Sequence, residues 1–166
     1  MSRILRFSTL GFLIALLAGC GKHDHDHKPA GGGHAHTAPH GGTLVEIGAH
    51  AYNLELLTDP ATGRLSAWVL DGHAENFVRV KAPALEATVD VGGSPRALSL
   101  KAVANPATGE TVGDTSQFEA QADWLKGVNR VQGSVASIEI RGTKFGPLAF
   151  KAGPAAPAAA PTQAAK

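Results

Sequence analysis

Short runs of alternating apolar and polar residues fill this 166-residue chain from about residue 43 to 150, with turn-forming residues between them. No stretch in that region shows a long helical period. Eight or nine such runs in this length predict an all-β fold, namely a single immunoglobulin-like β-sandwich. Low-complexity segments on both sides of it are expected to be disordered.

The first half of the domain is predicted to be a meander. Strands are expected at 43–47, 52–58 and 65–70, because apolar residues alternate there and Asp59-Pro60-Ala61-Thr62-Gly63 has the composition of a turn. Residues 71–76 are expected to form a loop, followed by a strand at 77–81.

The second half continues the same pattern. Residues 85–91 and 96–103 are predicted to form a hairpin across Gly92-Gly93-Ser94-Pro95, and 117–121 a further strand after a loop at 105–113. One helical turn is expected at 122–127, where Trp124 lies. Residues 128–141, interrupted by Gly133, and 143–150 are expected to close the sheet.

The first twenty residues have the features of a lipoprotein signal peptide. Arg3 and Arg6 precede an apolar run at 10–17 that is too short to span a membrane. The sequence Leu17-Ala18-Gly19-Cys20 resembles a bacterial lipobox, which implies cleavage before Cys20, a lipid anchor on its sulfur and exposure to the periplasm. By the same resemblance, glycine at position 21 favours the outer membrane. An ordinary signal peptide with an incidental cysteine is the alternative.

A histidine-rich tether follows this signal. We predict a signal peptide at 1–19, a lipidated cysteine and flexible tether at 20–42, the sandwich at 43–150 and an Ala/Pro-rich disordered tail at 151–166. The tether holds six of the eight histidines. Its predicted metal ligands are His23, Asp24, His25, Asp26, His27, His34, His36 and His40.

Such ligands suit divalent transition metals, namely Zn, Ni, Co or Cu(II). Soft sulfur ligands for Cu(I) are not expected, because Met1 is the single methionine and Cys20 would carry lipid. The alternative is a solvated spacer that happens to be rich in histidine.

A second metal site is predicted on the domain itself. In an antiparallel meander the loops after the first and third strands lie at the same end of the sheet. That places His50 beside the loop that holds Asp71, His73 and Glu75, and two imidazoles with one carboxylate form a transition-metal site. The alternative is that these residues only form turns, for which Asp71-Gly72 is well suited.

Three segments resemble a known kind of module. They are His40-Gly41-Gly42, Tyr52-Asn53-Leu54-Glu55-Leu56 and Leu70-Asp71-Gly72-His73-Ala74-Glu75-Asn76. Together with the closing stretch at 138–148, they resemble small β-sandwich modules of periplasmic proteins associated with heavy-metal efflux, including modules ahead of some efflux adaptor subunits. The resemblance covers roughly residues 40–150. Because no α-helical hairpin or biotinyl-lipoyl-like pattern accompanies it, the resemblance implies an accessory of an efflux complex or a stand-alone relative of these modules.

The net charge and the motifs of the sequence limit the classes of function that it predicts. Without Arg3 and Arg6 the chain has 13 basic and 14 acidic residues, which gives no electrostatic basis for binding nucleic acid. No nucleophile elbow, phosphate loop or His-Glu-x-x-His pair occurs, so no enzyme is predicted.

The sequence predicts a membrane-anchored, metal-binding lipoprotein accessory to metal efflux or homeostasis. The alternative is an envelope scaffold or protein-interaction lipoprotein whose histidine-rich segment is a spacer.

Overall fold

The computed structural model describes residues 36–155. The predicted signal peptide, Cys20 and the tether histidines from His23 to His34 lie outside the described residues, as does most of the Ala/Pro-rich tail. Within 36–155 there is no helix long and apolar enough to cross a membrane.

Ten strands and one short 3-10 helix make up the domain. They are β1 (Thr43–Ile47), β2 (Tyr52–Asp59), β3 (Arg64–Asp71), β4 (Ala84–Val91), β5 (Ser94–Ala102), β6 (Gln117–Gln121), η1 (Asp123–Leu125), β7 (Val131–Val135), β8 (Ile138–Ile140), β9 (Thr143–Phe145) and β10 (Leu148–Ala152).

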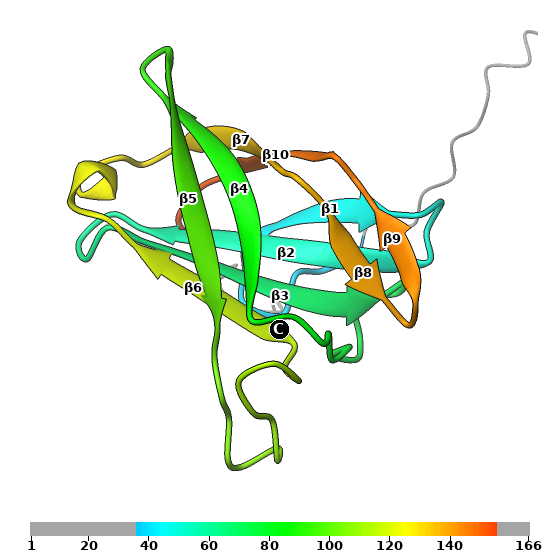
Figure 1. Ribbon diagram of the computed structural model, residues 1–166. Helices are drawn as coiled ribbons and strands as arrows, with labels where there is room; N and C mark the ends of the chain where they lie inside the picture. Colours follow the sequence, from blue (N-terminus) through cyan, green and yellow to red (C-terminus); the bar gives the residue numbers. More distant parts are fainter. Residues whose placement is uncertain (1–35, 156–166) are drawn as a thin grey trace, which may run out of the picture. The chain divides into compact units, whose positions relative to one another are not determined.

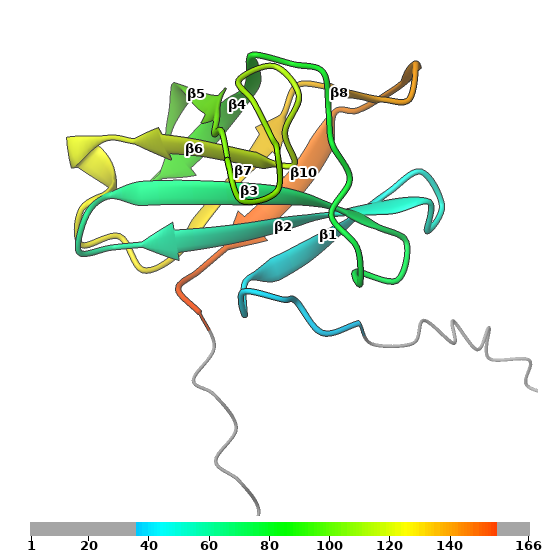
Figure 2. The same cartoon turned by 90° about the horizontal axis from the view of Figure 1, so that it is seen from below.

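Eight of these strands form one antiparallel sheet in the order β1-β2-β3-β6-β5-β4-β7-β10, and β8 and β9 form a separate hairpin. In Figure 1, β4 and β5 cross in front of β2, β3 and β6, so the sheet folds back over itself into two layers. The view in Figure 2 shows the same two layers from below. The prediction of an all-β sandwich is confirmed. Its two layers belong to one continuous ladder, whereas an immunoglobulin domain divides its strands between two sheets.

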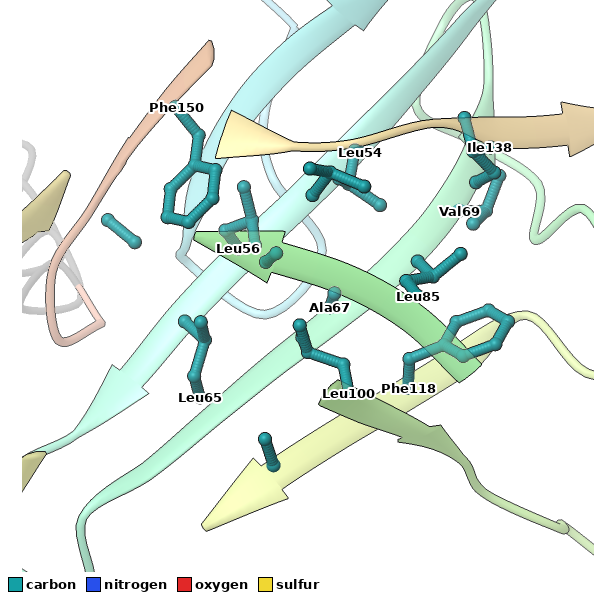
Figure 3. Packing of buried hydrophobic residues seen from close by; sticks show 14 of the residues in the cluster. Leu54, Leu56, Leu65, Ala67, Val69, Leu85, Leu100, Phe118, Ile138 and Phe150 are labelled. Carbon is teal, nitrogen blue, oxygen red and sulfur yellow. The ribbon is translucent and has the colours of Figure 1, made fainter. Parts of the chain in front are cut away.

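The core lies between the two layers and is built by the alternating residues that the sequence contains. Leu54 and Leu56 of β2 and Leu65 of β3 are fully buried and face Leu85 of β4 and Leu100 of β5 (Figure 3). Each such side chain contributes about 1.5–3 kcal/mol when it is removed from water. This apolar layer fixes the register of the strands, because a slip of one residue would turn every core side chain outward.

The largest departure from the predicted elements is at 77–81, where a strand was expected and the prediction is wrong. The backbone there makes only isolated bridges, Leu70 with Phe77 and Val80 with Thr115. The alternation at 77–81 is real, since Val78 and Val80 are buried. The apolar side chains of this segment cover the end of β3, but its backbone does not become a strand of the sheet.

The last two predicted strands are each divided in the structure. Residues 128–141 form β7 and β8, and 143–150 form β9 and the start of β10, with Gly146-Pro147 between those two strands. Strand β10 runs to Ala152, which is 3% exposed, so the core extends two residues past the predicted end of the domain at 150.

Candidate functional site

The face of β2 and β3 that points away from the core is also buried. Asn53 and Glu55 on β2, and Ser66, Trp68 and Leu70 on β3, are all at most 9% exposed. A sheet face that excludes water must be covered by another part of the chain. Here His40 of the segment 36–42 lies against Trp68 and Glu55, and the loop after β3 lies against Asn53. These two segments bring three histidines, His36, His40 and His73. We refer to these three as the histidine patch.

A buried carboxylate attaches the segment 36–42 to this face. Glu55 is fully buried, and its Oε1 accepts hydrogen bonds from the backbone N–H of His40 at 2.8 Å and of Gly42 at 2.9 Å. The ring Nδ1 of His40 lies 2.9 Å from Oε2. Because a carboxylate oxygen accepts, Nδ1–H donates this bond. Three donors thus satisfy one buried acid, and two residues assigned to the tether by the sequence are fixed to the sheet.

The backbone before β1 is shaped for this attachment. The N–H of Gly41 donates to the carbonyl of Ala38 at 3.0 Å, which closes a turn, and Gly41 has φ 73°. At Gly42 an added Cβ would lie 2.6 Å from the carbonyl oxygen of Leu56. Glycine at both positions therefore lets the chain approach β2 closely enough for its amides to reach Glu55.

The ring of His40 lies close to two aromatic side chains. It stacks on Trp68 with ring centroids 3.8 Å apart and 14° between the planes, and Phe77 lies 5.7 Å away on a tilted plane. The His40 side chain remains 34% exposed. Since Nδ1 is bound to Glu55, Nε2 is the ring nitrogen left for an external ligand.

The other two histidines of the patch meet each other. The rings of His36 and His73 have centroids 5.6 Å apart and planes at 74°. His36 comes from the end of the predicted tether, whereas His73 comes from the turn after β3. The fold therefore brings together one residue from each of the two metal sites that the sequence predicts.

The loop that carries His73 is ordered by its own polar groups. Asp71 accepts hydrogen bonds from the backbone N–H of Glu75 at 2.9 Å and from Nδ2 of Asn76 at 2.6 Å. The bond from the Asn76 side chain is the largest cause that holds the pKa of Asp71 below its usual value. Asn53 of β2 donates to the carbonyls of Asp71 and Gly72 at 3.0 Å.

The predicted second site is only partly assembled. Gly72 lies against the backbone carbonyl of His50, so His50 and the loop do share one end of the sheet. The His50 ring, however, lies with its Nδ1 3.1 Å from Oε2 of Glu46, and the Asp71 carboxylate is taken up by the loop. In the part of the chain that the structure describes, no group of three or more His, Cys, Asp or Glu side chains is placed to hold a metal.

Glu55, Trp68 and Phe77 were not identified from the sequence as parts of a site. A signal for Trp68 was present, because residues 65–70 read Leu-Ser-Ala-Trp-Val-Leu, an almost continuous apolar run of the kind found in strands buried on both faces. Glu55 gave no such signal, since a charged residue between two leucines also fits a strand with one solvated face.

No protein family, curated protein or solved structure matches this chain.

Proposed function

We propose that this protein is a non-catalytic lipoprotein of the cell envelope that binds divalent transition-metal ions through its histidine-rich tether. In this proposal Cys20 carries the lipid anchor, the protein faces the periplasm from the outer membrane, and the bound metal is passed to or held for an efflux or homeostasis system.

The observation that supports the proposal best is the contact between His40 and Glu55. Metal-binding histidines usually donate the N–H of one ring nitrogen to a carboxylate, a backbone carbonyl or water, which fixes the ring and leaves the other nitrogen for the metal. His40 has this arrangement, with Nδ1 2.9 Å from a fully buried carboxylate and the side chain still 34% exposed. His40 is also the last histidine of the predicted tether, so its Nε2 is a fixed ligand to which the preceding histidines can add.

Fixing one end of the tether also favours binding. His34 and His36 are six and four residues before His40, and a chain spans at most about 3.3–3.6 Å per residue. Imidazoles tied this closely to a fixed point have a high effective concentration there, which reduces the ordering cost of a site that is not preformed.

Zinc titration by calorimetry tests the proposal on the full chain in detergent micelles. The variant His23→Ala/His25→Ala/His27→Ala/His34→Ala should bind fewer zinc ions, with weaker overall affinity. His50→Ala is the matched control, because it also removes an exposed imidazole but lies outside the tether, and it should bind as the unaltered chain does. Equal stoichiometry and affinity in the four-histidine variant would contradict the proposal and favour a spacer in an interaction scaffold.

A further inference from the structure

The ring of His73 takes no part in the hydrogen bonds that order its loop. The loop is held by Asp71, Asn76 and Asn53 through the hydrogen bonds described above, all of which involve the backbone or side chains other than His73. The next residue, Ala74, is buried and has φ 58°, so the backbone at this point is fixed in a left-handed conformation. An exposed imidazole is thus presented by a rigid turn.

The spacing of His36 and His73 is close to that of two ligands on one ion. An imidazole nitrogen about 2.0–2.1 Å from a metal puts the ring centroid about 3.2 Å from it, and two such centroids are about 5 Å apart at a tetrahedral angle. The observed separation is 5.6 Å. Rotation about the Cβ–Cγ bond, which is broad in histidine, would direct a nitrogen of each ring to a common point.

We propose that His36 and His73 bind one divalent transition-metal ion together and that this ion clamps the tether onto the loop after β3. The inference rests on the proposed function and deepens it, because it assigns one of the bound ions to the domain. Water fills the remaining positions around the metal, as at metal sites that keep open coordination positions. The ion would join two segments that are 37 positions apart in the sequence.

The test is zinc calorimetry on the full chain with His36→Ala, His73→Ala and the double variant, and with His50→Ala as control. Each single substitution should weaken one zinc site by at least about tenfold, a loss no smaller than that caused by removing a partner of a metal ligand. If both residues hold the same ion, the loss in the double variant should be smaller than the sum of the single losses. Thermal unfolding in the absence of metal should be unchanged, and His73→Asn serves as a second variant if alanine disturbs the loop.

The outcomes separate this inference from the proposed function. Unchanged zinc binding in His73→Ala, together with loss of sites in the four-histidine tether variant, would overturn the clamp and leave the tether proposal standing. Additive losses in the double variant would also overturn it, since they indicate two independent ions. Unchanged binding in every variant would overturn both proposals.

Discussion

The imidazole of His40 lies flat on the indole of Trp68, with 3.8 Å between ring centroids. The same imidazole is bound to Glu55, which pairs with Trp68 in the register of β2 and β3. One side chain thus covers an aromatic residue and satisfies a buried acid on neighbouring strands. The stability of this face should therefore depend strongly on His40.

We expect His40→Ala to lower the free energy of unfolding by about 1–3 kcal/mol, because Oε2 of the buried Glu55 loses its donor. His40→Asn should cost less, since the Asn side-chain amide can take the place of Nδ1–H. Urea unfolding followed by circular dichroism measures both. In a Trp124→Phe background the emission of Trp68 should also shift to longer wavelength in His40→Ala, because water reaches the indole. Equal stability of the alanine and asparagine variants would contradict this role for Nδ1.

Replacing Glu55 separates its charge from its hydrogen bonds. Glu55→Gln keeps an oxygen for the amides of His40 and Gly42, and its side-chain amide can donate to Nδ1 of the other histidine tautomer. Glu55→Ala leaves three donors without their acceptor, at a cost of about 1–3 kcal/mol for each one that stays buried. The urea midpoint should therefore be highest for the unaltered chain, lower for Glu55→Gln and lowest for Glu55→Ala. A glutamine variant as unstable as the alanine variant would mean that the charge, not the hydrogen bonds, holds the segment.

A second buried acid should make stability depend on pH. Burial of Glu110 opposes its ionisation, but hydrogen bonds from Ser116 and Thr108 outweigh this and hold its pKa below the ordinary value of 4.5. A lowered folded-state pKa stabilises the protein above about 4.5 and loses this effect as the pH falls through the folded-state value. The difference in urea midpoint between the unaltered chain and Glu110→Gln should shrink from pH 7 to pH 3. A difference in urea midpoint that stays constant from pH 7 to pH 3 would contradict this prediction.

The close approach of Gly72 to His50 gives a steric prediction. A Cβ at position 72 would collide with the backbone carbonyl of His50, so Gly72→Ala should shift the loop and cost about 1–3 kcal/mol. Gly153→Ala is the matched control, because its added Cβ would be no closer than 3.5 Å to any neighbour. Thermal unfolding compares the two. Equal melting temperatures for Gly72→Ala and Gly153→Ala would contradict this prediction, because they would mean that the loop accommodates the added Cβ without loss of stability.

The lipid anchor can be tested independently of the metal. We expect the mature chain to begin at Cys20 with lipid on its sulfur, and Cys20→Ala to be neither processed normally nor retained on membranes. Mass spectrometry of the mature N-terminus and fractionation of cells measure this. Recovery of Cys20→Ala as a normally processed membrane protein would refute it.

Alternation of apolar residues was enough to place most strands. Residues 117–121 were predicted with the bounds that β6 has, and 52–58 and 65–70 lie within one residue of the ends of β2 and β3. Where the same alternation occurs without a free neighbouring strand, as at 77–81, periodicity alone misleads. Alternation indicates that one face of a segment is buried, but it does not indicate which strand the segment pairs with.

The site was harder to predict because its parts meet only through tertiary contacts. The meander argument placed His50 near Gly72 correctly, since it depends on strand direction alone. Nothing in the sequence indicated that the chain before β1 folds back over Trp68 and brings His36 to His73. That path depends on a buried acid in β2, and a single sequence does not show whether a strand's polar face is solvated or covered.

The continuous ladder also affects how the chain reaches its native state. β1, β2 and β3 pair with their neighbours in sequence. In contrast, β3 pairs with β6 and β4 pairs with β7, which are distant in the sequence, as in the pairing of Arg64 with Gln121 and of Thr88 with Ser134. Pairings between distant segments lose loop entropy before they gain contacts, so sheets rich in them fold slowly. The apolar inner face of the first meander therefore stays uncovered until the second half of the chain arrives. Folding of this domain should be limited by closure of these two pairings rather than by formation of its hairpins.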